Sequence, residues 1–86
     1  MLNNEDGKQI NIEIDEQISK GVYSNFVVVS HNENEFVMDF VFVFPQQQKN
    51  KVGARVISSP THIKRFLMAL TDNVKKYEEK HGPIPV

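Results

Sequence analysis

The stretch E35-F-V-M-D-F-V-F-V-F-P45 decides the fold, because eight of the nine positions from Phe36 to Phe44 are apolar. Side chains of a β-strand alternate between the two faces of its sheet, so a strand that is apolar throughout is covered on both faces. The exception is Asp39, a carboxylate that needs a cation or hydrogen-bond donors in such surroundings. The stretch therefore predicts a central strand with two covered faces and a polar partner for Asp39.

The segments around this strand predict three further strands. Residues 9–16 alternate isoleucine with polar residues, which is typical of a half-buried edge strand. Residues 22–31 are rich in β-branched and aromatic side chains, and residues 52–58 have the same character. Residues 35–44 form the third strand, and the Asn-Glu-Asn sequence before it favours a tight turn. Four strands in this order predict an antiparallel meander.

A long helix is predicted after the last strand. Ser59 can cap its N-terminus, Pro60 suits the first turn, and Gly82 followed by Pro83 ends it. Apolar residues at spacings of three and four form one stripe: Ile63, Phe66, Leu67, Leu70, Val74 and Tyr77. The fold class is therefore α+β, a four-stranded antiparallel meander sheet with one long C-terminal helix packed on one face.

Strand register follows from a hypothesis about the first turn. If His31 lies opposite Glu35, then Phe26 lies opposite Phe40, and an apolar second hairpin places Phe40 opposite Val56. One face then carries the phenylalanines, which the helix covers. The other face is mainly valine, and no second helix is present to cover it. A second copy of the chain is the simplest cover, so we expect a homodimer or a higher homo-oligomer.

The same register defines one polar cluster on the valine-rich face, formed by Tyr23, Asn25, Asp39 and Arg55. Asp39 would lie opposite Ile57, with Arg55 and Asn25 each one diagonal step away. One interpretation is an ion pair that fixes the strand register. The other is a binding site for a polar group, with Tyr23 contributing, and the sequence alone does not separate the two.

Composition limits the class of protein. The chain has 86 residues, a net charge of −1 and no cysteine, which excludes disulfides and thiolate sites. No segment approaches the roughly 18 apolar residues of a membrane helix, and no signal pattern opens the chain, so a cytoplasmic protein without membrane contact is expected. Residues 1–8 are expected to be a disordered tail, and residues 9–86 a single β4α domain.

Charge is unevenly distributed along the chain. Residues 1–43 carry two basic and eight acidic side chains, a net −6, while residues 44–86 carry eight basic and three acidic ones, a net +5. Either the acidic strands lie against the basic helix within one fold, or the basic end meets an acidic partner such as nucleic acid.

No catalytic constellation can be assembled from the sequence. The histidines His31, His62 and His81 have no neighbours at metal-ligand spacing, and the serines lack a nucleophile-elbow context. The glycines form no phosphate-binding loop. We therefore expect no enzyme, no metal and no cofactor.

Several short patterns occur together in a fixed order: Gly21-x-Tyr23-x-Asn25, Ser30-His31, Phe36-x-x-Asp39-Phe40, Arg55, Ser59-Pro60, Asn73, Tyr77, Glu78 and Gly82. Over residues 10–84 the chain resembles a small uncharacterised bacterial family, domain of unknown function family 3467. The resemblance implies a cytoplasmic non-enzyme, and a link to the transcription machinery, because members are often encoded near genes for RNA polymerase large subunits. The order of elements alone is also similar to the protein-export chaperone SecB.

These observations predict a small macromolecule-binding module with a protein partner that the sequence does not identify. Two alternatives are a SecB-like chaperone that binds unfolded chains, and a nucleic-acid-binding protein that uses the basic helix residues.

Overall fold

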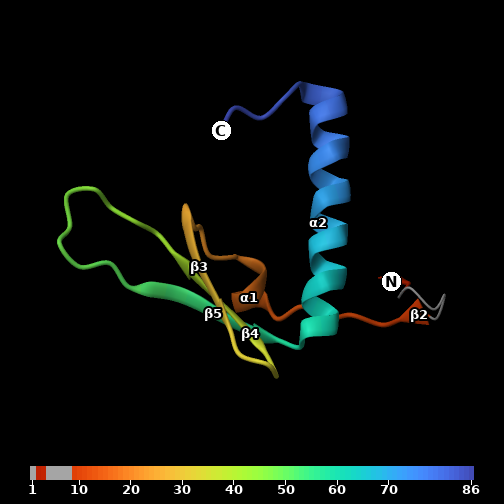
Figure 1. The fold of residues 1–86 in the computed structure, drawn as a ribbon, viewed down its shortest axis with the longest axis horizontal. Coiled ribbons are helices and arrows are strands. Elements are labelled where there is room, and N and C mark those ends of the chain that lie inside the picture. The colour runs from red at the N-terminus through yellow and green to blue at the C-terminus, as the bar shows by residue number, and fades with distance from the viewer. Residues whose placement is uncertain (1, 4–8) are drawn as a thin grey trace.

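The computed structural model describes residues 2–3 and 9–86. Within them the chain forms a two-stranded ribbon, a three-stranded sheet and two helices (Figure 1). The elements are β1 (Leu2–Asn3), β2 (Gln9–Ile10), α1 (Glu16–Ser19), β3 (Phe26–His31), β4 (Phe36–Val41), β5 (Val52–Ser58) and α2 (Pro60–His81). The architecture is α+β with an antiparallel sheet and a C-terminal helix, as the sequence predicted.

The main sheet has three strands in the described part of the chain, in the order β3-β4-β5, and the prediction of four is wrong. Only Gln9–Ile10 of the expected strand 9–16 is a strand, and it pairs with β1 in a separate ribbon. The alternating isoleucines suit an extended chain, but no strand of the described residues pairs with residues 11–15, and α1 begins at Glu16. A hydrophobic pattern predicts extension; a strand also needs a hydrogen-bonding neighbour.

The expected tail, residues 1–8, lies mostly outside the described residues. Residues 1 and 4–8 are not described, whereas Leu2–Asn3 form strand β1. The single domain over residues 9–86 stays a prediction.

The first hairpin differs by one residue from the expected register. His31 pairs with Phe36, so Phe26 lies opposite Val41 and not opposite Phe40. The cause is Asn32, whose side-chain oxygen accepts hydrogen bonds from the N–H groups of Asn34 (2.8 Å) and Glu35 (3.0 Å). Its backbone N–H also donates to the Glu35 carbonyl, which draws Glu35 into the turn. A slip of one residue moves every β3 side chain to the opposite face.

The second hairpin differs by two residues, which leaves its faces unchanged. Phe40 pairs with Ala54 rather than Val56, and Asp39 pairs directly with Arg55 rather than Ile57. An irregularity between Phe40 and Val41 then shifts the ladder by one residue.

The sheet therefore has two faces of different composition, each named here by its main feature. The helix-side face carries Val27, Val29, His31, Phe36, Met38, Phe40, Ala54, Val56 and Ser58. The ion-pair face carries Phe26, Val28, Ser30, Val37, Asp39, Val41, Arg55 and Ile57. The expectation of two largely apolar faces is met, although the β3 residues have exchanged sides.

Helix α2 begins and ends at the predicted residues. The Ser59 hydroxyl accepts a hydrogen bond from the His62 N–H (3.2 Å), and Pro60 occupies the first turn. At the other end Gly82 has a φ of 90°, a left-handed conformation that favours glycine, and its N–H donates to the Glu78 carbonyl.

The position of α2 differs from the prediction that it packs along the sheet. Figure 1 shows the helix standing up beside the sheet, in contact with it only near its first turns. A hollow between Met38, Phe40, Val56 and Ser58 of the sheet and Ile63 and Phe66 of the helix marks that contact. The rest of the apolar stripe, including Leu70 and Val74, is exposed.

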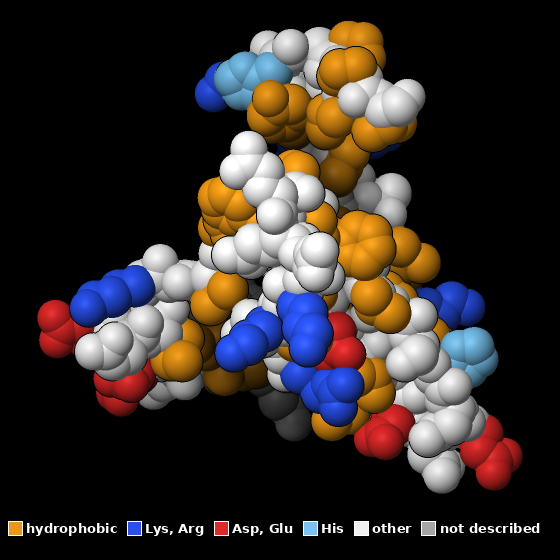
Figure 2. Space-filling model, turned by 90° about the vertical axis from the view of Figure 1, so that its left-hand side faces the viewer, with side chains coloured by type: hydrophobic (Ala, Val, Ile, Leu, Met, Phe, Trp, Pro, Cys, Tyr) orange, Lys and Arg blue, Asp and Glu red, His pale blue; other side chains and the backbone are white. Residues whose placement is uncertain are grey.

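The chain by itself encloses very little core. Among the described residues Val41, at 9% exposure, is the one hydrophobic side chain that is buried. Hydrophobic side chains lie at the surface over both the helix and the sheet (Figure 2). The described part of the chain contains no helix that combines the length and the hydropathy needed to cross a membrane.

We expect Ser59→Ala to lower the free energy of unfolding by about 1 kcal/mol, because the helix loses its N-cap acceptor. Ser59→Asp restores an acceptor and should retain most of the stability. Urea unfolding followed by circular dichroism measures both variants. Equal losses in the two variants would show that the cap does not hold this end of the helix.

Candidate interaction site

A bidentate ion pair between neighbouring strands lies on the ion-pair face. Asp39 on β4 and Arg55 on β5 lie directly opposite each other. Arg55 donates from Nε to Oδ1 of Asp39 (2.7 Å) and from Nη2 to Oδ2 (2.8 Å). Parallel double hydrogen bonds of this kind fix both side chains in one orientation. The sequence predicted the pair but placed it one diagonal step apart.

The two charges stabilise each other. The hydrogen bonds and the positive charge of Arg55 lower the pKa of Asp39 below its ordinary 3.8, against the opposing effect of partial burial. The same contacts raise the pKa of Arg55. The Asp39 side chain is 16% exposed while that of Arg55 is 61% exposed. The carboxylate is thus sheltered, and the guanidinium presents its outer edge to the surface.

Apolar side chains surround the ion pair on the same face. Phe26, Val28 and Ile57 are exposed, whereas Val37 is half-buried and Val41 is buried. A contiguous apolar surface with a fixed polar group in its middle is typical of protein interfaces rather than of solvated sheet faces.

Asn25, the third residue of the predicted cluster, has a different set of partners. Its side chain donates from Nδ2 to the Val43 carbonyl (3.1 Å), and its Oδ1 accepts from the Val43 N–H (2.7 Å). The carboxamide thereby acts as a strand neighbour for the chain beyond β4, where the backbone ladder has ended. Asn25 has a structural role at the end of the sheet.

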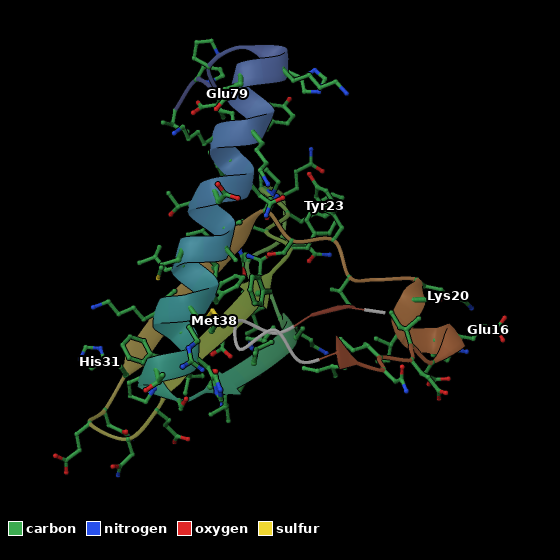
Figure 3. The ribbon with its side chains drawn as sticks, turned by 90° about the vertical axis from the view of Figure 1, so that its right-hand side faces the viewer. Glu16, Lys20, Tyr23, His31, Met38 and Glu79 are labelled. Carbon is green, nitrogen blue, oxygen red and sulfur yellow. The ribbon has the colours of Figure 1, made fainter. Side chains whose placement is uncertain are left out.

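Tyr23, the fourth residue, lies at the same end as Asn25. Its ring meets Phe42 edge to face at 5.5 Å between centroids, and Phe42 in turn contacts Phe44 at 5.3 Å. The Tyr23 side chain is 74% exposed and stands away from the helix base in Figure 3. The structure therefore joins Asp39 to Arg55 but gives Tyr23 and Asn25 other partners.

A second apolar hollow lies on the helix-side face, between the sheet and α1. Its lining comprises Gln17, Ile18, Gly21, Val22, Phe40, Ala54 and Val56. The sequence interpretation missed it because it expected a strand over residues 9–16 and no helix after it. Gly21, with a φ of 75° and its N–H bonded to the Ile18 carbonyl, provided the signal for a helical turn that ends there.

The described residues contain no group of three or more histidine or acidic side chains placed to hold a metal ion. On the basic helix, Lys76 pairs with Asp72 at 3.1 Å, so part of its positive charge is neutralised locally.

Fold and site together define a small α+β protein with an ion-paired, apolar sheet face. Comparison with known proteins then places the chain in a family of proteins of unknown function, DUF3467, whose family model matches residues 1–85. No curated protein and no solved structure match the chain, so the expected similarity to SecB has no support.

We expect the ion pair to make stability depend on pH in the acid range. Because the pKa of Asp39 is lowered on folding, its contribution is present above its ordinary value of 3.8 and disappears as the pH falls through the lower folded pKa. Thermal melts of the wild type and Asp39→Asn should therefore differ most at neutral pH and converge in strong acid. A pH-independent difference would mean that the carboxylate is not stabilised by Arg55.

A double-mutant cycle tests the coupling directly. Asp39→Val and Arg55→Leu should each lower the melting temperature, because each leaves one charge without its partner. The double variant should lose less than the sum of the two single losses, since neither charge remains. Strict additivity would contradict a direct contact between the two side chains.

Proposed function

We propose that the chain is a non-catalytic protein-interaction module that binds another protein through its ion-pair face. The observation that supports this function is the combination of a rigid Asp39–Arg55 pair with exposed Phe26, Val28 and Ile57 around it. Interface centres combine apolar area with a few fixed polar groups, and arginine is enriched among the residues that dominate binding energy.

The ion pair suits Arg55 to this role. Two of its N–H groups are held by Asp39, which reduces the side-chain freedom that binding would otherwise remove. A guanidinium has five N–H donors, so others remain for carbonyl or carboxylate oxygens of a partner. The partner is therefore a protein with an apolar surface and an oxygen acceptor at its centre.

Two other functions are consistent with parts of the surface. A chaperone for unfolded chains would use the same apolar area, but such chains need no single oriented donor. A nucleic-acid-binding protein would use the lysines of α2, of which Lys76 is already paired with Asp72. A defined protein partner accounts for the ion pair better than either. The resemblance to family 3467 makes components of the transcription machinery the first proteins to look for.

Affinity purification with quantitative mass spectrometry tests the proposal. Ile57→Lys places a charge in the apolar surface, whereas Met68→Lys makes the same type of change at an exposed position off the helix stripe. A defined protein should be retained by the wild type and Met68→Lys and reduced about tenfold by Ile57→Lys, a loss of about 1.4 kcal/mol in binding.

Three outcomes would contradict the proposal. The first is recovery of the same proteins with all three chains. The second is suppression of aggregation of unrelated unfolded proteins at near-equal ratios, which would indicate a chaperone. The third is recovery of nucleic acid that is lost steeply with added salt, which would indicate the basic helix as the binding surface.

A further inference from the structure

We propose that two copies of the chain exchange their C-terminal helices, so that α2 of each copy covers the helix-side face of the other. This inference concerns the face opposite the ion pair and does not depend on the proposed function. It rests on the connection before α2, the exposed helix stripe, the hollow beside α1 and the area that one chain leaves uncovered.

The connection between β5 and α2 is a single residue. Strand β5 ends at Ser58 and α2 begins at Pro60, which leaves Ser59 alone between them. Ser59 is extended, at φ −71° and ψ 157°, because a residue before proline avoids the helical region. Strand–helix connections that fold a helix back on its sheet commonly use about 2–6 residues. This short connection directs α2 away from its own sheet.

Only the start of α2 contacts its own sheet. Ile63 and Phe66 share a hollow with Met38 and Val56. In Figure 3 Met38 lies at the base of the helix and Glu79 lies near its far end, well beyond the sheet. The later stripe residues Leu70, Val74 and Tyr77 are all exposed.

The helix-side face has a hollow of matching character that α2 of the same chain does not fill. Ile18 and Val22 form one wall, and Phe40 and Ala54 form the floor. Ala54 has the smallest side chain of these four residues, so a helix can approach the strands closely beside it. Every chain thus offers an apolar hollow that the exposed second half of a helix stripe could fill.

The exposed area of the chain is too large for a monomer. A folded protein of 9.9 kDa exposes about 5,200 Å² by the general scaling with mass, whereas this chain exposes 8105 Å². Its radius of gyration is 15.8 Å, against about 12 Å for a compact chain of this length. The excess is about 2,900 Å² on each chain, or about 5,800 Å² for two copies, so it is large enough to supply the roughly 2,000–5,000 Å² that obligate dimers bury in total.

A second copy of the chain would cover both the exposed stripe of α2 and the hollow beside α1. Every chain offers one unpaired helix stripe and one open hollow, so a twofold arrangement fills both hollows with the same contact. The 22 residues of α2 span roughly 33 Å, enough for the first turns to stay on one sheet while the rest crosses to the other. Short connections of this kind favour exchange of elements between copies.

Site-specific cross-linking tests the exchange, and the natural chain contains no cysteine to interfere. Two full-length single variants, one with Val74→Cys and one with Ala54→Cys, are unfolded together, refolded as a mixture and treated with a short bismaleimide. Both changes keep side-chain size similar, and circular dichroism checks folding. Glu79→Cys, from the opposite side of the helix, replaces Val74→Cys as the matched control.

The exchange predicts a covalent dimer in the mixture, with a cross-linked peptide that joins position 74 to position 54. Its yield should exceed that of the Glu79→Cys mixture by at least about tenfold. A stronger product from Val74→Cys alone would mean that the helices pair with each other. A chain that carries both Val74→Cys and Ala54→Cys is treated in the same way, and an internal cross-link in it without covalent dimer would mean that α2 folds onto its own sheet. Absence of every such product would also overturn the exchange.

Discussion

The one-residue connection between β5 and α2 is the constraint on which the rest of the structure depends. Ser59 is held extended by Pro60, and its hydroxyl caps the helix, so the direction of α2 is set at its first turn. A helix with this start leaves its apolar stripe facing outward. The small buried core of the single chain and the proposed helix exchange both follow from that geometry.

The sequence predicted the elements whose signals are local. The cap at Ser59, the stop at Gly82 and strand β5 all lie where the pattern placed them. The partners of the ion pair were also predictable, because a carboxylate among valines requires a cation and Arg55 was the basic residue within reach.

Features that depend on a single side chain or on a missing neighbour were not predictable. The first hairpin register is set by the two hydrogen bonds to Asn32, which changed the turn length by one residue. Residues 9–16 have the pattern of a strand, but within the described part of the chain only Gln9–Ile10 pair with another strand. The role of Asn25 as a partner for Val43 required knowing where the backbone ladder ends. Hydrophobic periodicity carries none of this information.

The two faces of the sheet suggest a division of roles. On the helix-side face, the stripe of α2 and the hollow beside α1 are complementary in character, which supports self-association. On the ion-pair face, Asp39 and Arg55 form a fixed polar group within apolar surface, which supports recognition of a different protein. Under the two proposals a dimer would carry one ion-pair face on each copy, and it would gain avidity toward a partner that presents two copies of the matching surface.

We propose that this chain needs a second copy to enclose its core. Light scattering combined with thermal melts over a wide range of protein concentration tests it most directly. The exchange predicts twice the 9.9 kDa mass of one chain and a melting temperature that rises with concentration, because folding and association are coupled. A stable species with the mass of one chain and a concentration-independent melting temperature would contradict it.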